Sequence, residues 1–374
     1  MINILYLIDH IWNWNGGTEG QLLMLIRGLD PEKYRTHLFC LKETPWSKTA
    51  RVDFPLRVLH IHKLLGPGIL PKIVAFREYC RRNKIDIIQT YFNDALIFGV
   101  LAGRFAGVKR IIASRRNLGP GFWKKRGQLF AFRALKGMIT GYMANSLATR
   151  ESVAYYEGVD PQKIEIIYNG LDLRRFDVVD EAVRRETRDK LGLSESNVLI
   201  GMVAHLRREK NISLFLKAAH IISRGYPEAR FVILGEGGER ANLEAEIMSL
   251  GIEKTVTLTG SVMDVVPYLA AMDIACLTSD GESFSNSIIE YQAAGLPVVA
   301  TSVGGNCEAI PSKDLLFAPN DLDGFVKILS RLASSVEMRR RIGQENRQLA
   351  YRRYSVATMI SQHEEMYRKC MSES

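Results

Sequence analysis

Along the first half of the chain, short apolar runs take turns with longer stretches in which apolar residues recur every three or four positions. Short apolar, β-branched runs predict buried strands, and stretches with apolar residues at helical spacing predict helices. The predicted strands cover residues 2–8, 36–41, 57–61, 85–90, 110–114, 142–146 and 164–168, and the predicted helices cover 18–29, 71–83 and 95–106. This order is typical of a doubly wound parallel sheet, in which ligands bind at the carboxyl ends of the strands.

The second half of the chain repeats the pattern. Predicted strands cover residues 198–203, 230–234, 255–258, 273–277 and 297–300, and predicted helices include 212–223, 240–250 and 264–271. A chain of 374 residues suits two domains. We place an α/β domain at 1–175 and another at 176–351, joined by a charged linker around 170–195. The last helical region, 336–371, is long enough for its end, from about residue 352 to 374, to pack back on the first domain.

Composition is typical of a globular protein, with 47% hydrophobic and 24% charged residues. No apolar run approaches the roughly 18 residues of a membrane span. The apolar start, residues 2–8, lacks the basic residues and cleavage site of a signal peptide, which favours the strand. Five cysteines without a CxxC pattern predict free thiols in a reducing cytoplasm (Cys40, Cys80, Cys276, Cys307 and Cys370).

The net charge of +9 is concentrated in the first half. Residues 1–175 contain 27 Lys and Arg against 14 Asp and Glu, whereas the remainder contains 23 against 27. A basic half indicates an anionic partner such as phospholipid, a lipid-linked diphosphate or nucleic acid, although solubility alone also explains it. Residues 122–133 combine aromatic and basic side chains. They fit a helix in a membrane interface, or an ordinary helix with its aromatic side chains packed inward.

Residues 279–308 hold the densest group of candidate binding residues. Glu282 lies in a loop of small residues, and Asn286 and Glu290 share one face of the helix that follows. A carboxylate accepts hydrogen bonds from two vicinal hydroxyl groups, as on a ribose or a hexose. Backbone N–H groups at the start of that helix, around Phe284 and Ser285, attract an anion. Ordinary surface charges are the alternative interpretation of both glutamates.

Two further segments are candidates for binding phosphate. Lys210 follows a predicted strand and lies near Arg207, and cations at the carboxyl end of a strand suit a diphosphate. A solvated basic turn is the alternative. Gly16 and Gly17 connect the first strand to the first helix, which predicts an anion site at the helix N-terminus or simply a tight connection.

Three motifs resemble a cofactor or metal site only in part. Residues 235–237 begin like a dinucleotide fingerprint, but Arg240 takes its third glycine position. Residues 321–323 form a DxD sequence that opens a helix, where N-capping explains it. His60 and His62 would share one face of a strand, but no third ligand accompanies them. We therefore expect neither a metal nor a bound cofactor.

The chain resembles the family-4 group of retaining glycosyltransferases, which have the GT-B fold. The second half matches at residues 231–237, 257–261, 273–279, 294–301 and 304–308, and at the E-x7-E pair Glu282 and Glu290. The first half matches more thinly, at residues 16–19, 145–146 and 168–172. The resemblance implies two Rossmann-like doubly wound domains that face each other across a cleft. It also implies transfer of a sugar from a nucleoside-diphosphate donor, with retained configuration and without a metal.

The resemblance also implies a role for each matching residue. Glu290 would hold the ribose, Glu282 would contact the donor sugar, and Lys210 would steady the diphosphate and the leaving group. Donors that act on a developing charge are catalytic because they bind most strongly in the transition state. The other implied donor-binding positions are Gly16, Gly17, His205, Arg207, Gly235, Ser261, Phe284, Ser285 and Asn286.

Two positions depart from the family pattern. His205 stands where the family often has Arg, so His205 or Arg207 takes the second cationic role. At the end of the strand around residues 110–114, the family often has a catalytic-face His, and by strand position Arg116 replaces it. We include Arg116 with Glu282 and Lys210 among the catalytic candidates, as the polar group on the acceptor side.

The predicted function is that of a cytoplasmic transferase acting at or near the inner face of the cell membrane. The acceptor would be a glycan or a lipid-linked molecule of envelope polysaccharide or glycolipid synthesis, and it would approach the basic first domain. A related fold with other chemistry, such as a nucleotide-sugar epimerase or a phosphorylase, is one alternative. A non-catalytic polyanion-binding protein is another, although the basic residues do not form a recognisable nucleic-acid module, so we expect no nucleic-acid partner.

Overall fold

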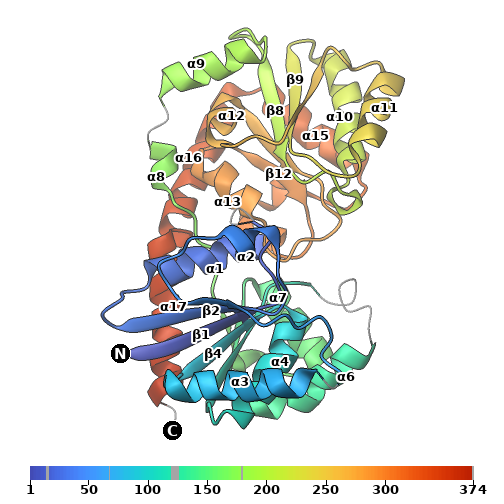
Figure 1. Cartoon of the computed structure of the whole chain (residues 1–374). Helices are drawn as coiled ribbons and strands as arrows, with labels where there is room; N and C mark the ends of the chain where they lie inside the picture. Colours follow the sequence, from blue (N-terminus) through green and yellow to red (C-terminus); the bar gives the residue numbers. More distant parts are fainter. Residues whose placement is uncertain (14–16, 67, 119–125, 178–179, 373–374) are drawn as a thin grey trace. The chain divides into compact units, whose positions relative to one another are not determined.

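The chain forms two units, each built on one parallel β-sheet (Figure 1). A computed structural model describes residues 1–13, 17–66, 68–118, 126–177 and 180–372. The first unit comprises 1–170 and 356–374, and the second comprises 171–355. The sequence-based boundaries lay at 175 and 351. Each sheet with its helices is a doubly wound α/β layer structure, as the sequence predicted.

The first sheet has seven strands in the order β3-β2-β1-β4-β5-β6-β7. Their bounds are β1 Ile2–Ile8, β2 Tyr34–Cys40, β3 Leu56–Val58, β4 Ile87–Tyr91, β5 Arg110–Arg115, β6 Gly141–Ala144 and β7 Ile164–Ile166. All paired strands run parallel. The central strand β1 is buried on both faces from Ile4 to Ile8, which explains its unbroken apolar sequence.

Helices cover both faces of the first sheet. They are α1 Gly17–Gly28, α2 Pro45–Thr49, α3 Ile69–Arg82, α4 Asn93–Phe105, α6 Arg126–Leu135, α7 Leu147–Glu157 and α17 Val356–Ser372. One apolar core joins α1 and α17 to one face of the sheet. Two others join α3, α4, α6 and α7 to the opposite face. Figure 1 shows α3 and α4 beside each other at the foot of this unit.

Helix α17 is tied into the first unit by buried polar groups as well as by apolar packing. The hydroxyl groups of Tyr6 and Tyr367 lie 3.0 Å apart, and the Tyr367 hydroxyl donates to Oε1 of Gln89 at 2.5 Å. The side chain of Gln89 in turn donates to Oγ of Ser114 at 2.7 Å. This chain of buried hydrogen bonds joins α17 to three strands of the sheet.

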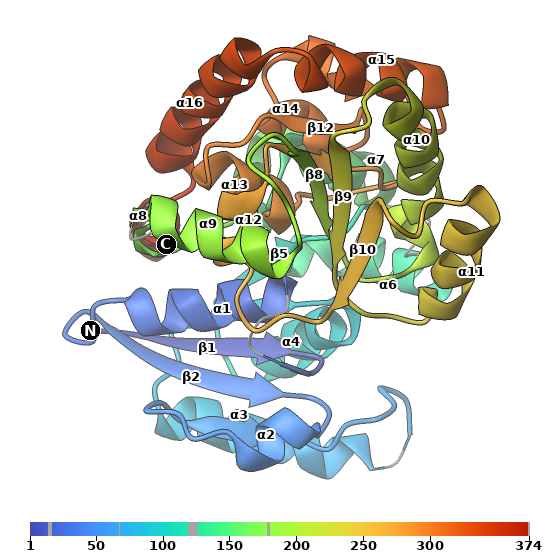
Figure 2. The ribbon, with the colours of Figure 1, turned by 90° about the horizontal axis from the view of Figure 1, so that it is seen from above.

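The second sheet has six parallel strands in the order β10-β9-β8-β11-β12-β13. Their bounds are β8 Val198–Val203, β9 Ala229–Leu234, β10 Val256–Gly260, β11 Ile274–Leu277, β12 Val298–Thr301 and β13 Leu316–Phe317. The helices are α8 Arg174–Asp177, α9 Glu181–Lys190, α10 Ile212–Gly225, α11 Arg240–Leu250, α12 Val266–Ala271, α13 Asn286–Ala293, α14 Asn306–Ala309, α15 Leu322–Ala333 and α16 Val336–Arg353. Figure 2 shows α10 and α11 on one side of this sheet and α12 and α13 on the other.

The charged segment around residues 170–195 is part of the second unit, so its interpretation as a linker was wrong. Arg184 and Arg188 of α9 bind the two oxygens of Asp273, at 2.8 and 3.2 Å. Asp273 also accepts the backbone N–H of Leu199 at 2.8 Å. The charges that suggested a solvated linker therefore form a partly buried ion-pair network that fixes α9 against the start of β11.

Two local predictions have opposite outcomes. Asp321 caps α15, and its side chain accepts the N–H of Gly324 at 2.9 Å, which confirms N-capping as the explanation of the DxD sequence. The placement of His60 and His62 on a strand was wrong. Strand β3 ends at Val58, and His60 has a left-handed backbone conformation with φ 52°, so the two-residue alternation of a strand is lost.

Candidate functional site

A carboxylate and a lysine meet at the carboxyl ends of β8 and β11, which are neighbours in the second sheet. Nζ of Lys210 lies 2.5 Å from Oε1 of Glu282, and Oγ of Ser279 donates to the same oxygen at 2.7 Å. Both charged side chains are mostly buried, with 26% and 13% of their surfaces exposed. The fold thus brings together two of the predicted catalytic residues, which are far apart in the sequence.

Backbone and side-chain hydrogen bonds hold the two loops that carry this pair. Oγ1 of Thr278 donates to the carbonyl oxygens of Lys210 and Asn211, each at 2.9 Å. Oγ1 of Thr301 donates to the carbonyl oxygen of Ser279 at 2.6 Å. These hydroxyl residues were not predicted from the sequence. Their position directly after β11 and at the end of β12 is the signal that identifies them.

The glycine turn after β12 is required by a close backbone approach. A Cβ atom at Gly305 would lie 2.1 Å from the carbonyl oxygen of Ser283, so no other residue fits there. The N–H of Gly305 donates to the carbonyl oxygen of Glu282 at 3.0 Å. The second glycine turn of residues 279–308 therefore supports the loop that carries Glu282.

Helix α13 begins immediately after that loop. Its N-cap residue, Ser285, makes no side-chain capping hydrogen bond, and the first-turn N–H groups of a helix have no partner within the helix. Asn286 and Glu290 lie one turn apart on α13. The side chain of Phe284 is buried and packs edge-on against Tyr354, with ring centroids 5.5 Å apart. Only the backbone of Phe284 therefore remains as a candidate for donor binding.

Glu290 has an unusual electrostatic environment. Burial raises the pKa of its carboxyl group to about 7, while Arg175 lowers it and Asp264 raises it further. Arg175 and Asp264 form an ion pair at 2.7 Å near the protein surface. Neither residue was predicted from the sequence. A carboxyl group that titrates near neutral pH in a polar site is a common feature of binding and catalytic sites.

The loops after β8, β9 and β10 lie against one another and explain the glycines at 235–237. Gly235 has φ 145°, and a Cβ atom there would lie 1.9 Å from the carbonyl oxygen of Ala204. Its N–H donates to the carbonyl oxygen of Gly260 at 2.9 Å. The Gly-x-Gly sequence therefore serves close backbone packing. The three predicted side chains on these loops are exposed (His205, Arg207 and Ser261).

The pKa of His205 is lowered, mainly by partial burial and then by the positive charges of Arg207 and Lys210. Its imidazole is therefore mostly neutral at pH 7, because the ordinary pKa of histidine already lies near 6.5.

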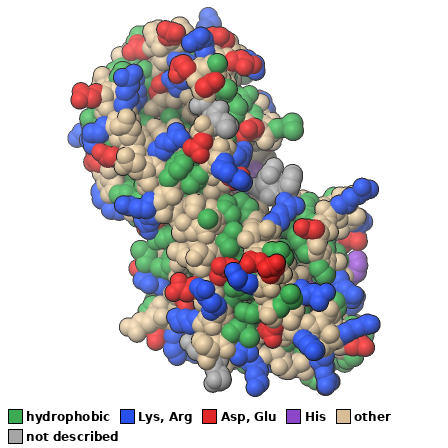
Figure 3. Space-filling view, turned by 90° about the vertical axis from the view of Figure 1, so that its left-hand side faces the viewer, with side chains coloured by type: hydrophobic (Ala, Val, Ile, Leu, Met, Phe, Trp, Pro, Cys, Tyr) green, Lys and Arg blue, Asp and Glu red, His purple; other side chains and the backbone are tan. Residues whose placement is uncertain are grey.

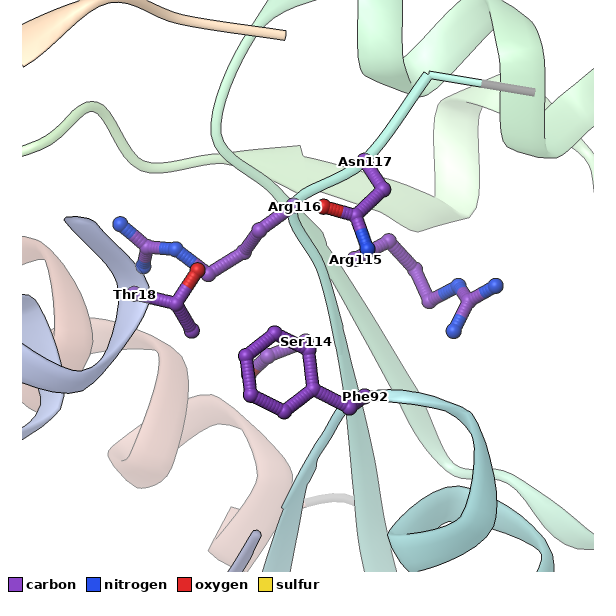
Figure 4. A pocket seen from close by; sticks show the side chains of 6 residues that line it. All are labelled: Thr18, Phe92, Ser114, Arg115, Arg116 and Asn117. Carbon is purple, nitrogen blue, oxygen red and sulfur yellow. The ribbon is translucent and has the colours of Figure 1, made fainter. Parts of the chain in front are cut away.

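In the first unit, a small pocket lies at the carboxyl end of β5 (Figure 4). It is lined by Thr18, Phe92, Ser114, Arg115, Arg116 and Asn117. The side chain of Arg116 is buried and donates to Oδ1 of Asn169. Of the predicted glycines, Gly17 is the first residue of α1, whereas Gly16 lies outside the described residues.

A strained residue and a buried carboxyl group lie beside this pocket. Phe92 precedes α4 with φ 67°, which is uncommon for an aromatic residue, and its ring stacks on His10 at 5.7 Å. Oδ1 of Asp9 accepts the N–H of Ala95 at 2.6 Å, at the start of the same helix. Burial raises the pKa of Asp9 to about 7. No role was predicted for these residues from the sequence.

Comparison with protein families matches both halves of the chain. Residues 15–175 match the model described as Glycosyltransferase Family 4, and residues 183–349 match the model described as Glycosyl transferases group 1. Together these two matches span most of the described structure of both units.

Individual relatives and solved structures are similar over most of their length. An Escherichia coli UDP-Gal:alpha-D-GlcNAc-diphosphoundecaprenol alpha-1,3-galactosyltransferase is 26% identical, with 81% of each chain covered. A D-inositol 3-phosphate glycosyltransferase of Pseudarthrobacter chlorophenolicus is 28% identical over 65% of this chain and 62% of its own. The crystal structure of Anabaena Alr3699/HepE in complex with UDP has a TM-score of 0.88 at 20% identity, covering 98% of this chain and all of the other.

Proposed function

Since the chain belongs to the family-4 (group 1) glycosyltransferases, we propose that it transfers a sugar, with retained configuration and without a metal, from a UDP-sugar to a glycan or lipid-linked acceptor. The observation that carries this proposal is the pairing of Lys210 with Glu282 beside the N-terminus of α13. The relative that acts on a diphosphoundecaprenol-linked sugar supports an acceptor of envelope polysaccharide or glycolipid synthesis.

The second unit supplies groups suited to each part of the donor. Lys210 and the first turn of α13 would bind the diphosphate and stabilise the charge that develops on the leaving group. Glu290, one turn into α13, would accept hydrogen bonds from the ribose hydroxyl groups. Glu282 would leave Lys210 and accept hydrogen bonds from hydroxyl groups of the donor sugar. In the first unit, Arg116 takes the polar position on the acceptor side.

A nucleotide-sugar screen tests this proposal. Thermal unfolding is measured with UDP-glucose, UDP-galactose, UDP-N-acetylglucosamine and GDP-mannose, because a ligand that binds only the folded protein raises its melting temperature. We expect a rise with UDP-sugars that Glu290→Ala abolishes. Incubation with the donor alone separates a transferase from an epimerase. Conversion of the donor sugar to its epimer without an acceptor would contradict the proposal, as would the absence of any nucleotide-dependent shift.

We also propose that the first unit contacts the inner face of the cell membrane. Five apolar side chains on α3, α4 and α6, here called the α3–α4–α6 surface, are between 48% and 75% exposed (Leu70, Val74, Leu101, Phe105 and Phe130). The guanidinium of Arg77 lies 4.7 Å from the ring centre of Phe105, joining α3 to α4. Residues 95–150 contain 11 Lys and Arg and no Asp or Glu. Exposed apolar side chains among basic ones suit an anionic lipid surface.

This surface differs from the segment that the sequence suggested. Residues 122–125 of the predicted segment lie outside the described residues, and α6 begins at Arg126. On α6 the two aromatic side chains diverge, since Phe132 is buried while Phe130 is exposed. On the face seen in Figure 3, Lys and Arg are interspersed with Asp and Glu. No helix among the described residues is long and apolar enough to cross a bilayer.

Vesicle co-sedimentation tests the membrane contact. We expect the protein to bind vesicles of phosphatidylglycerol and phosphatidylethanolamine at low salt, and the double variant Leu101→Glu, Phe105→Glu to lose this binding. Met248→Glu, on the exposed face of α11 in the second unit, is the matched control and should bind as the unmodified protein does. Equal binding by the double variant would exclude the α3–α4–α6 surface.

A further inference from the structure

Two adjacent arginines at the end of β5 are both buried, but their surroundings differ. Arg115 is 5% exposed and Arg116 is 7% exposed. Figure 4 shows the two side chains leaving the strand in opposite directions. Arg115 pairs with the buried carboxylate of Glu157 at 2.7 Å, so its charge is neutralised within the first unit. Arg116 forms no such ion pair among the described residues.

The described residues that interact with the Arg116 side chain are uncharged. Its guanidinium donates to the amide oxygen of Asn169, and among the described residues no carboxylate forms an ion pair with it. Burial raises the pKa of Tyr91 to about 12 and lowers the pKa of His363 to about 4, so both are uncharged at pH 7.

A buried cation without a counter-ion is costly for a folded protein. Removing a charge from water is compensated only by an opposite charge or by several hydrogen bonds. Burial lowers the pKa of Arg116, but an arginine side chain in a protein still keeps its proton and so cannot avoid this cost by deprotonation. An anion supplied from solution would neutralise the charge, and the pocket beside Arg116 provides a place for it.

We propose that this pocket binds a phosphate group of a substrate through Arg116. The guanidinium fork matches two phosphate oxygens, and the hydroxyl group of Thr18 in the pocket lining adds a further donor. In Figure 4 the Arg116 side chain extends towards Thr18 of α1. The absence of any acidic residue between 95 and 150 favours the approach of a polyanion.

Two substrates could supply this phosphate. One is the diphosphate of the donor, and the other is a phosphate on the acceptor, such as those named for the diphosphoundecaprenol-linked and inositol 3-phosphate acceptors of the two relatives. Assigning the phosphate to a substrate rests on the proposed transferase function. Binding of inorganic phosphate does not depend on that function. The phosphate site and the transferase function can therefore fail independently in the experiments below.

Equilibrium dialysis with labelled inorganic phosphate, at ionic strength fixed by NaCl, tests the site. The dissociation constant should rise at least tenfold in Arg116→Gln, because charge-assisted hydrogen bonds are lost. Arg116→Lys should retain part of the affinity, since it keeps the charge without the fork. Arg133→Gln removes an exposed arginine of the same basic stretch and should bind as the unmodified protein does. Equal affinity in Arg116→Gln, or equal loss in Arg133→Gln, would overturn the proposal.

Repeating the dialysis with saturating UDP identifies the source. Phosphate binding that UDP abolishes assigns the pocket to the donor diphosphate, and binding that persists assigns it to the acceptor. Both results support a phosphate site at Arg116. The separate proposal of a UDP-sugar site in the second unit fails only if UDP itself does not bind.

Melting temperatures show whether Arg116 binds phosphate or only supports the fold. This measurement also tests the site if Arg116→Gln folds too poorly for dialysis. Phosphate should raise the melting temperature of the unmodified protein, and raise that of Arg116→Lys less. The same rise in both proteins would contradict the proposal.

Discussion

The two units place a cation at the end of a strand in contrasting ways. In the second unit, Lys210 follows β8 and pairs with Glu282 at 2.5 Å. In the first unit, Arg116 follows β5 and donates to the neutral amide of Asn169. Lys210 therefore has a counter-ion before any ligand arrives, whereas Arg116 has none among the described residues. The carboxyl end of a parallel strand thus carries a neutralised cation in the second unit, and in the first unit a cation without a counter-ion among the described residues.

This difference suggests how each unit responds to an anion. Under the proposed function, a diphosphate that binds Lys210 would compete with Glu282 and release its carboxylate, which could then accept hydrogen bonds from sugar hydroxyl groups. An anion that binds Arg116 would displace no ion pair among the described residues. Binding would therefore break an ion pair in the second unit and form a new one in the first.

The largest expected effect comes from breaking the paired arginine beside Arg116. Arg115→Gln leaves the buried carboxylate of Glu157 without its partner and should lower the free energy of unfolding by about 3–5 kcal/mol. Arg116→Gln should leave the free energy of unfolding unchanged or raise it, because it removes an uncompensated buried charge and leaves no buried carboxylate unpaired. Urea unfolding followed by circular dichroism measures both. Equal destabilisation by the two substitutions would show that Arg116 also has an internal counter-charge.

The next effect concerns catalysis by Lys210. Lys210→Ala should lower the rate of UDP release from UDP-glucose about 10²–10³-fold, as expected when a donor to developing charge is removed. Lys217→Ala, an exposed position on α10, is the control and should leave the rate unchanged. A normal rate in Lys210→Ala would remove this residue from the proposed mechanism.

Glu282→Gln distinguishes the two partners of the ion pair. Loss of one charged hydrogen-bond partner of the donor sugar should lower kcat about 10–150-fold, equivalent to about 1.5–3 kcal/mol. The affinity for UDP should not weaken, because UDP lacks the sugar and Lys210 no longer has a competing carboxylate. Calorimetry with UDP and steady-state kinetics with UDP-glucose measure the two quantities. Weaker UDP binding together with normal kcat would contradict the assigned role.

The smallest effect is a pH dependence of UDP-glucose binding. The pKa of Glu290 is raised to about 7, so its carboxyl group is increasingly protonated below that pH. A protonated carboxyl group accepts fewer hydrogen bonds from ribose, and the affinity for UDP-glucose, whose two phosphates do not titrate in this range, should therefore fall as pH decreases from 8 to 5.5. The change should not exceed about tenfold per pH unit. Glu290→Gln should bind more weakly and show no such dependence, and an unchanged pH profile would place the titrating group elsewhere.

The elements of the fold were largely predictable because their signals are local. Apolar runs such as residues 2–8 and 198–203 identify strands that are buried on both faces. The E-x7-E spacing placed Glu282 in a loop and Glu290 on a helix, as observed. Parallel sheets carry their binding loops at one edge, and Lys210 and Glu282 meet there because β8 and β11 are adjacent.

The rest depended on contacts that no local pattern encodes. The charge of α9 is the same whether Arg188 is solvated or bound to Asp273, so the sequence suggested a linker. The strand predicted to run through His60 ends before it, and His60 takes a left-handed backbone conformation. The neutral surroundings of Arg116 come from Tyr91, Asn169 and His363, which lie on three segments far apart in the sequence.

The return of α17 to the first unit has a consequence for biosynthesis. A ribosome makes α17 after the whole second unit, so the partner of Tyr6 and Gln89, Tyr367, is synthesised only after residues 171–355. The second unit, which is continuous from 171 to 355, is able to fold before then. The nascent first unit meanwhile exposes the apolar face that α17 later covers. Premature termination shortly before residue 356 would therefore yield a chain whose second unit folds. Its first unit would expose an apolar face to which chaperones and proteases bind.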